Sequence, residues 1–170
     1  MGIVEAVTTC LHKYATFNGR ASRSEFWWYF LAVNVAIFSS AAISTALSFF
    51  IPPAIAMMIS IIPVVVMLGS FIPSLSVVWR RMHDIGKPGY HIFMPYALIF
   101  ALGILIAIFE KFDVYYGGSS DDGVSGPLAW ILMIPFLFVI LSFLVIPWWL
   151  TRPSQPYTNA YGPNPNEVPT

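Results

Sequence analysis

Charged side chains are scarce in this sequence, and that scarcity excludes most classes of soluble protein. Asp, Glu, Lys and Arg make up 9% of the 170 residues, against roughly 25% in an ordinary soluble domain. Apolar residues make up 58%, which is too many for a disordered chain or for a water-soluble enzyme domain of this size. Acidic and basic residues are equal in number, eight each, so no basic excess points to a nucleic-acid partner. The composition predicts an integral membrane protein.

A second cysteine is missing as well, so Cys10 has no partner for an internal disulfide. We interpret Cys10 as a small apolar filler in an N-terminal helix. The three histidines, His12, His83 and His91, lack the spacing of a zinc-binding HExxH helix. Phosphate-binding loops and serine-nucleophile motifs are also missing. The sequence therefore predicts no catalytic residue, no cofactor and no metal site.

Three long intervals carry no Asp, Glu, Lys or Arg, namely residues 26–79, 88–109 and 123–151. A helix needs about 20 residues to cross the roughly 30 Å hydrocarbon core of a bilayer. The first interval is long enough for two crossings, with Pro52 and Pro53 at the turn between them. Backbone groups in lipid must be satisfied within the segment, which requires helices. We expect an all-α protein whose 26–150 domain has four transmembrane helices, near residues 26–50, 54–79, 91–109 and 127–150.

Seven of the eight basic residues fall on one side of these four spans. The connection at 110–126 carries the eighth, Lys111, among four acidic residues. Because Lys and Arg accumulate in cytoplasmic loops, both termini and the 80–90 connection are expected to be cytoplasmic. The seven residues are Lys13, Arg20, Arg23, Arg80, Arg81, Lys87 and Arg152.

The two segments that flank the transmembrane domain are predicted to differ in secondary structure. Within the cytoplasmic segment 1–25, apolar residues at spacings of three and four predict an amphipathic helix over 3–17. It is either an interfacial helix on the membrane or a short packed helix without contact to lipid. Ser22 and Glu25 have the spacing of a capping box, with Ser22 as N-cap of the first span. The Pro- and Asn-rich segment 151–170 has no helical period, which predicts an extended cytoplasmic tail.

Polar residues of unusual density flank the spans on the cytoplasmic side. If the second span continues through Asp84, Arg80 and Asp84 lie one turn apart on one helix face. Asp84 could also accept from Arg20 or Arg23. Guanidinium groups match carboxylates and phosphates alike, so the cluster is either an internal ion-pair network or a receptor for anionic phospholipid. Its members are Arg20, Arg23, Arg80, Arg81, His83, Asp84 and Lys87.

The predicted spans contain no Asp, Glu, Lys or Arg, which argues against ion-coupled transport because carriers place such groups along their pathway. Asn34 is an uncharged polar residue within the first span. We expect it to form a hydrogen bond to another helix. His83 and Asp84 are adjacent in sequence and so point to different helix faces, which does not favour a catalytic dyad.

Three ordered motifs are similar to those of one known family. Phe17, Gly19, Arg20, Arg23, Glu25, Phe26 and Trp27 form the first motif, and Arg80, Arg81, His83, Asp84 and Gly86 form the second. Asn159, Tyr161, Gly162 and Pro165 form the third. With these motifs, residues 14–165 resemble the bacterial inner-membrane family called domain of unknown function 805. The resemblance implies a small multi-pass protein of the bacterial cytoplasmic membrane, and it implies no established activity.

Three functions are compatible with the sequence. The first is a non-enzymatic scaffold or accessory component, whose cytoplasmic Arg/Asp cluster organises the helix ends and binds a partner or anionic lipid. The second is a small oligomeric transporter or channel. The third is a lipid-acting membrane enzyme that uses His83 and Asp84. The partners implied are the bilayer, anionic phospholipid, a second copy of the chain or another membrane protein, and no nucleic acid.

Overall fold

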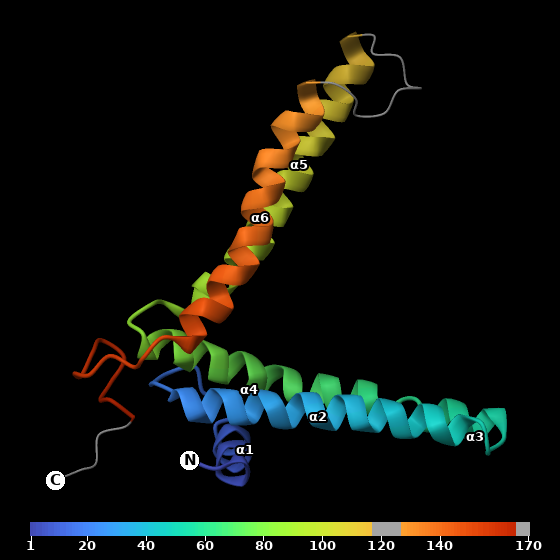
Figure 1. The fold of residues 1–170 in the computed structure, drawn as a ribbon, viewed down its shortest axis with the longest axis vertical. Helices are drawn as coiled ribbons and strands as arrows, with labels where there is room; N and C mark the ends of the chain where they lie inside the picture. The colour runs from blue at the N-terminus through green and yellow to red at the C-terminus, as the bar shows by residue number, and fades with distance from the viewer. Residues whose placement is uncertain (117–126, 166–170) are drawn as a thin grey trace. The chain divides into compact units, whose positions relative to one another are not determined.

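The computed structural model describes residues 1–116 and 127–165, and the named elements in these ranges are all helices. No strand occurs among them, only an isolated bridge between Asn159 and Gly162. This confirms the all-α prediction. The chain divides into two compact units, one made of Met1–Gly89 with Arg152–Thr170 and the other of Tyr90–Thr151. In chain order the elements are α1 Ile3–His12, α2 Arg23–Ser48, α3 Pro53–Ile59, α4 Ile62–Asp84, the 3-10 helix η1 Gly89–Phe93, α5 Met94–Tyr116 and α6 Pro127–Thr151 (Figure 1).

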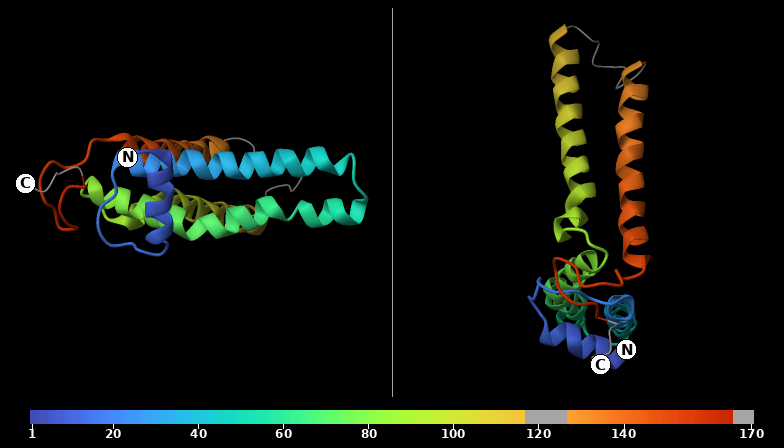
Figure 2. Two further views of the ribbon diagram at one scale, coloured as in Figure 1. Left: turned by 90° about the horizontal axis from the view of Figure 1, so that it is seen from below. Right: turned by 90° about the vertical axis from the view of Figure 1, so that its left-hand side faces the viewer.

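Helices α2 and α4 of the first unit lie side by side, and α1 crosses them (Figures 1 and 2). α1 buries Ala6 and Cys10 against this pair and leaves Val4 and Leu11 exposed. Cys10 is thus the small buried filler that its sequence context predicted. The packing of α1 agrees with the packed-helix interpretation, whereas its exposed apolar side chains leave lipid contact as a prediction.

The start of α2 is set by a side-chain cap. The Ser22 hydroxyl accepts from the Glu25 backbone N–H at 3.2 Å, which confirms Ser22 as the N-cap. This bond satisfies one of the four N–H groups that a helix start leaves without an internal partner. α2 therefore begins at Arg23, three residues before the predicted boundary, and it ends at Ser48 rather than at residue 50.

The second predicted span is divided at Ser60 and Ile61 into α3 and α4. Pro63 lies in the first turn of α4, and it has no N–H to offer the carbonyl of Ile59 four residues earlier. The Ser44 hydroxyl of α2 lies 3.2 Å from that carbonyl oxygen. Pro73 lies within α4, which continues through it. Of the two prolines, only Pro63 coincides with a break.

α4 ends at Asp84, five residues beyond the predicted boundary at 79. Gly86 adopts a positive φ of 77° and donates to the His83 carbonyl at 3.0 Å. Lys87 donates to the Met82 carbonyl at 2.9 Å. These two bonds form a Schellman motif, which ends a helix at a residue with left-handed backbone geometry. Glycine adopts that geometry without steric cost. Gly86 therefore fixes the end of α4 and with it the position of Asp84.

The second unit consists of α5 and α6, which lie side by side (Figures 1 and 2). Tyr96 of α5 meets Phe143 of α6 edge to face, with ring centroids 6.0 Å apart. α5 begins three residues later than the predicted 91–109 span, after the 3-10 turn η1, and it continues to Tyr116. α6 agrees with the predicted span 127–150 to within one residue.

Three helices in the described part of the chain are long and apolar enough to cross a membrane. Their apolar side chains are largely exposed, as with Phe38 of α2 and Leu68 of α4, which is the arrangement expected of helices in lipid. The fourth predicted span corresponds to α6, whose residues Phe136–Thr151 are apolar and include no Asp, Glu, Lys or Arg. The three longer stretches are α2 (Arg23–Ser48), Pro53–Asp84, which contains α3 and α4, and Gly89–Ile108, which contains η1 and the first part of α5.

Candidate functional site

Three segments far apart in sequence meet at one end of the first unit. They are the approach to α2, the last turn of α4 and the chain after α6. The Ala21 N–H donates to the Arg80 carbonyl at 3.1 Å, and the Gln155 N–H donates to the Asp84 carbonyl at 3.1 Å. These backbone bonds hold the segments together. Between them lies a buried cluster that we call the arginine junction: Arg20, Glu25, Arg80, Arg81 and Asp84.

Asp84 is the centre of the arginine junction, and its side chain is completely buried. One carboxylate oxygen accepts from Arg20 Nε at 2.9 Å, and the other accepts from Arg81 Nη1. A carboxylate buried without a partner would cost several kcal/mol, and two guanidinium groups remove that penalty. Of the two partners from the α2 approach that the sequence left open for Asp84, Arg20 and Arg23, the structure pairs it with Arg20.

Arg80 does not pair with Asp84, so the one-turn pairing predicted from the sequence is wrong. Its Nη1 donates instead to Glu25 Oε1 at 2.6 Å. The Glu25 carboxylate is thereby directed to α4, and only the Ser22 half of the capping box forms. The reason is tertiary, since α2 and α4 pack closely enough to bring a second carboxylate to Arg80.

Cys10 joins this pair from α1, with its sulfur 3.8 Å from Glu25 Oε1. Burial, together with the nearby Glu25 charge, raises the pKa of the Cys10 thiol from 9.0 to about 12. Both effects disfavour a thiolate, because a second negative charge would have to be buried beside the first. Cys10 is therefore a protonated donor to Glu25 at neutral pH.

Arg20 binds the chain that follows α6, in addition to Asp84. Its Nη2 donates to the Gln155 carbonyl at 2.6 Å. Its Nη1 donates to the carbonyls of Tyr157 at 2.9 Å and Gly162 at 3.3 Å. Arg81 adds a bond to the Arg152 carbonyl. The segment predicted as an extended tail is thus attached to the arginine junction by backbone carbonyl groups.

His83 holds the same segment through its ring and its backbone. The imidazole stacks on Tyr161 with ring centroids 3.8 Å apart and an interplanar angle of 6°. Its Nδ1 lies 3.2 Å from the Gly19 carbonyl, and its own carbonyl accepts from Asn159 Nδ2 at 2.9 Å. The ring faces Gly19 and Tyr161, while both oxygens of Asp84 bind arginines. The geometry of this pair is not that of a catalytic dyad.

Five of the seven residues predicted for the cluster come together here: Arg20, Arg80, Arg81, His83 and Asp84. Arg23 is exposed, and it forms no salt bridge within the described residues. Lys87 lies half-buried in the turn after α4. Sequence reasoning left Glu25 and Gln155 out of the cluster. Glu25 stood out as a capping residue and as a member of the first motif, and no signal marked Gln155.

Asn34, the polar residue predicted to join two helices, bonds within its own helix. Its Nδ2 donates to the Phe30 carbonyl at 2.8 Å. Asparagine can satisfy a carbonyl one turn earlier without any neighbour. In the described residues of the first unit, an interhelical bond of this kind is made by Ser44 instead.

The fold and the arginine junction define a helical protein with apolar helices of membrane-spanning length. The chain belongs to the family described as Protein of unknown function (DUF805), which matches residues 14–115. This confirms the resemblance inferred from the motifs. The match contains the first two motifs, and the structure brings the third, at Asn159, Tyr161 and Gly162, onto them. Comparison with curated proteins and with solved structures gives no match.

Proposed function

We propose that this protein is a non-enzymatic scaffold or accessory component of the bacterial inner membrane. It has four spans, with both termini and the arginine junction on the cytoplasmic face and α1 at that interface. The distribution of basic residues supports this orientation, and the exposed Val4 and Leu11 of α1 support its contact with lipid. The arginine junction organises the helix ends and presents the segment after α6 to a partner protein.

One observation carries this proposal, namely that a buried arginine fixes an exposed aromatic residue. Arg20 is 7% exposed and holds the carbonyls of Gln155 and Tyr157, whereas the Tyr157 residue is 80% exposed. An aromatic side chain on a fixed backbone loses little entropy on binding, and tyrosine is enriched at the energetic centres of protein interfaces. Tyr157 is therefore the proposed contact to a partner protein.

Anionic phospholipid is a separate matter, because each buried guanidinium group of the arginine junction already donates to a carboxylate, although Arg80 Nε and Nη2 have no hydrogen-bond partner among the described residues. Arg20 and Arg81 donate to Asp84, and Arg80 donates to Glu25. Displacing these acceptors would leave carboxylates buried and unpaired, at a cost of several kcal/mol. We assign attraction of anionic headgroups to the exposed Arg23 and Lys13 instead, at about 1 kcal/mol each.

Photo-crosslinking in intact bacterial membranes tests the contact to a partner. Tyr157 of the full-length protein is replaced by benzoylphenylalanine and irradiated, and adducts are identified by mass spectrometry. We expect one discrete protein adduct, which is lost in Arg20→Lys and retained in Arg23→Lys. Adducts with lipid alone, or a protein adduct that Arg20→Lys leaves unchanged, would contradict the proposal.

Reporter fusions test the orientation. Fusions at both termini and in the 80–90 connection are expected to report the cytoplasm, and fusions in the 110–126 connection the opposite side. The same compartment for the 80–90 and 110–126 connections would exclude the four-span topology.

The two alternative functions differ in what supports them. A lipid-acting enzyme using His83 and Asp84 is disfavoured, because the Asp84 oxygens both accept from arginines. Full cellular function in His83→Ala and Asp84→Asn variants that remain folded would remove it. An oligomeric transporter or channel stays a prediction, which flux through proteoliposomes measured against empty vesicles tests.

A further inference from the structure

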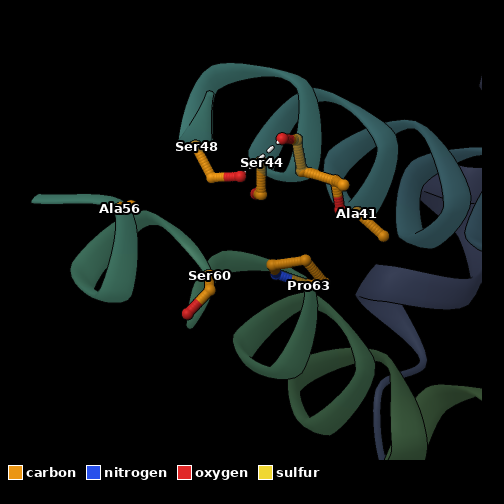
Figure 3. Close-up of a pocket in the computed structure, with 7 residues that line it drawn as sticks. Ala41, Ser44, Ser48, Ala56, Ser60 and Pro63 are labelled. Atoms are coloured by element: carbon orange, nitrogen blue, oxygen red, sulfur yellow. Dashed lines mark hydrogen bonds between the residues drawn. The ribbon is translucent and has the colours of Figure 1, made fainter. Parts of the chain in front are cut away.

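Burial in the first unit changes at one level along α2 and α4. From Phe30 to Ile72 the single buried residue is Ser44, which lines the opening at the break between α3 and α4 together with Ser60 and Pro63 (Figure 3). We call residues 30–72 the exposed hairpin. Its two arms, α2 from residue 30 onward and α3 with α4 up to residue 72, each have about the 20 residues that a helix needs to cross the hydrocarbon core.

The chain beyond this level is packed. α4 buries at least one residue in every turn from Pro73 to Asp84, where it packs against α1 and the start of α2. Trp27 and Trp28 of α2 lie close to the start of the exposed hairpin and are themselves exposed. Tryptophan accumulates where the hydrocarbon of a bilayer meets the headgroups. The change in burial therefore coincides with a pair of tryptophans of the kind expected at that boundary.

α1 crosses α2 and α4 at the same level (Figure 2). The hydroxyl of Tyr14, just after α1, donates to the Gly69 carbonyl at 2.8 Å. That carbonyl has no donor within α4, because Pro73 four positions later lacks an N–H. The Ser76 hydroxyl donates to the Thr16 carbonyl at 2.6 Å. These bonds attach the end of α1 to α4 where the exposed hairpin ends.

α1 has an apolar side and a polar side. Ala6 and Cys10 are buried against α2 and α4. At about 100° per residue, apolar residues lie on one side of this buried face and polar residues on the other. The apolar side consists of Ile3, Val7 and Leu11, and the polar side consists of Glu5, Thr9 and His12. Because α1 is right-handed and runs from α2 to α4 (Figure 2), its apolar side faces the exposed hairpin and its polar side faces the arginine junction.

We propose that α1 lies in the plane of the membrane interface with its apolar side in lipid, and that the hydrocarbon ends at the level of Phe30 and Ile72. Lipid is the occupant because the apolar side of α1 is continuous with the exposed hairpin, whose apolar side chains are exposed along its whole length. An interfacial helix buries its apolar side about 5–10 Å into the boundary between headgroups and acyl chains. This placement deepens the proposed function and rests on its membrane orientation.

The same placement puts the arginine junction in water. Asp84 follows Ile72 by about 18 Å along α4, at roughly 1.5 Å per residue, whereas the headgroup layer on each side of a bilayer is roughly 5–8 Å thick. Arg20 of the junction holds the Tyr157 carbonyl. Tyr157 therefore lies beyond the headgroups, where a protein can reach it.

Spin labels test both the side of α1 that meets lipid and the level of the boundary. Leu11→Cys and His12→Cys are neighbouring exposed positions on the two sides of α1, and they form a matched pair. Phe71→Cys reports the exposed hairpin, and Thr158→Cys reports the segment at the arginine junction. Each is labelled in full-length Cys10→Ala protein in vesicles of phosphatidylethanolamine and phosphatidylglycerol.

Collisions with dissolved oxygen, which concentrates in hydrocarbon, are compared with collisions with a hydrophilic nickel chelate, which stays in water. The ratio of oxygen to nickel collisions is expected to be several-fold higher at Leu11→Cys than at His12→Cys, high at Phe71→Cys and low at Thr158→Cys. Equal ratios at Leu11→Cys and His12→Cys, with a high ratio at Phe71→Cys, would overturn the placement of α1 and leave the proposed spans intact. A low ratio at Phe71→Cys would contradict the proposed spans themselves. A high ratio at Thr158→Cys would overturn the level of the boundary.

Discussion

Arg20 and Asp84 are 64 positions apart in sequence, and their side chains meet at 2.9 Å in the interior of the first unit. Arg20 uses its remaining nitrogens to hold the carbonyls of Gln155, Tyr157 and Gly162. One guanidinium group therefore joins the start of α2, the end of α4 and the segment after α6.

Replacing the guanidinium group of Arg20, which donates several hydrogen bonds, should release the segment after α6. Arg20→Lys keeps the charge, but an ammonium group cannot reach the carboxylate and three carbonyls together. Each charge-assisted bond lost is worth about 1.5–3 kcal/mol, so chymotrypsin should cleave after Tyr161 at least about tenfold faster. Limited proteolysis in detergent measures the rate, and Arg23→Lys, at an exposed arginine outside the junction, is the control. Equal cleavage in the two variants would refute the role of Arg20.

Asp84→Ala should destabilise the protein more than His83→Ala. The first variant leaves Arg20 and Arg81 buried without their shared carboxylate, at a cost of about 3–5 kcal/mol. The second loses one ring stack and one hydrogen bond, at a cost of about 1–2 kcal/mol. Thermal unfolding in detergent compares them. Equal melting temperatures would show that Asp84 does not neutralise the buried arginines.

Cys10 should resist alkylation in the folded protein. Its pKa is raised to about 12 by burial and by Glu25, so only about one thiol in 10⁴ is ionised at pH 8. Iodoacetamide, which reacts with the thiolate, should modify Cys10 rapidly only after denaturation. Rapid modification of the folded protein at pH 8 would contradict the buried contact with Glu25.

The same pKa predicts how stability depends on pH. The unfolded thiol releases its proton near pH 9.0, whereas the folded thiol keeps it up to about pH 12. Between these values the unfolded state binds fewer protons, so stability falls as pH rises. Thermal unfolding from pH 8 to pH 11 should therefore show a steeper loss in the wild type than in Cys10→Ala, in which the group is removed and all other titrations remain.

Substitution by alanine should change the stability in opposite directions at Gly69, within α4, and at Gly86, just after it. Gly86→Ala places a side chain at a φ of 77°, which costs about 1–2 kcal/mol, and the new Cβ meets the Gln155 side chain. Gly69 lies within α4, and a Cβ there meets nothing within 4 Å, so Gly69→Ala should stabilise by about 0.5–1 kcal/mol. Unfolding of the two variants measures the contrast. Unchanged stability of Gly86→Ala would contradict the need for a left-handed residue at this position, and destabilisation by Gly69→Ala would contradict the open space at Gly69.

Much of the fold could be predicted from local signals. The N-cap at Ser22 and the helix over 127–150 agree with the structure to within one residue, because capping and hydropathy act over a few neighbouring positions. The end of the charge-free interval predicts that α4 ends at Trp79, whereas the helix continues for five more residues to Asp84. Arginines and an aspartate can extend a helix when each finds a partner across it, and that partner is not visible locally.

In the arginine junction, too, local signals limited the possible pairs, and the packing of the helices decided between them. Helix periodicity favoured Arg80 with Asp84, whereas the structure pairs Arg80 with Glu25 and Asp84 with Arg20. Spacing along one helix limits which residues share a face, but the energy of a buried ion pair depends on which helices pack together. Gln155 acts through its backbone N–H and C=O, which any residue carries, so no pattern of side chains could have marked it.

The distribution of charge along the chain determines by itself that this protein has long apolar helices separated by polar connections, because each residue contributes its transfer energy independently of distant parts of the chain. Tertiary structure alone decided which carboxylate neutralises which arginine, and it attached the segment after α6 to them. A buried charge is stable only beside a partner, and partners that are 64 or 137 positions away are brought together only when the helices pack.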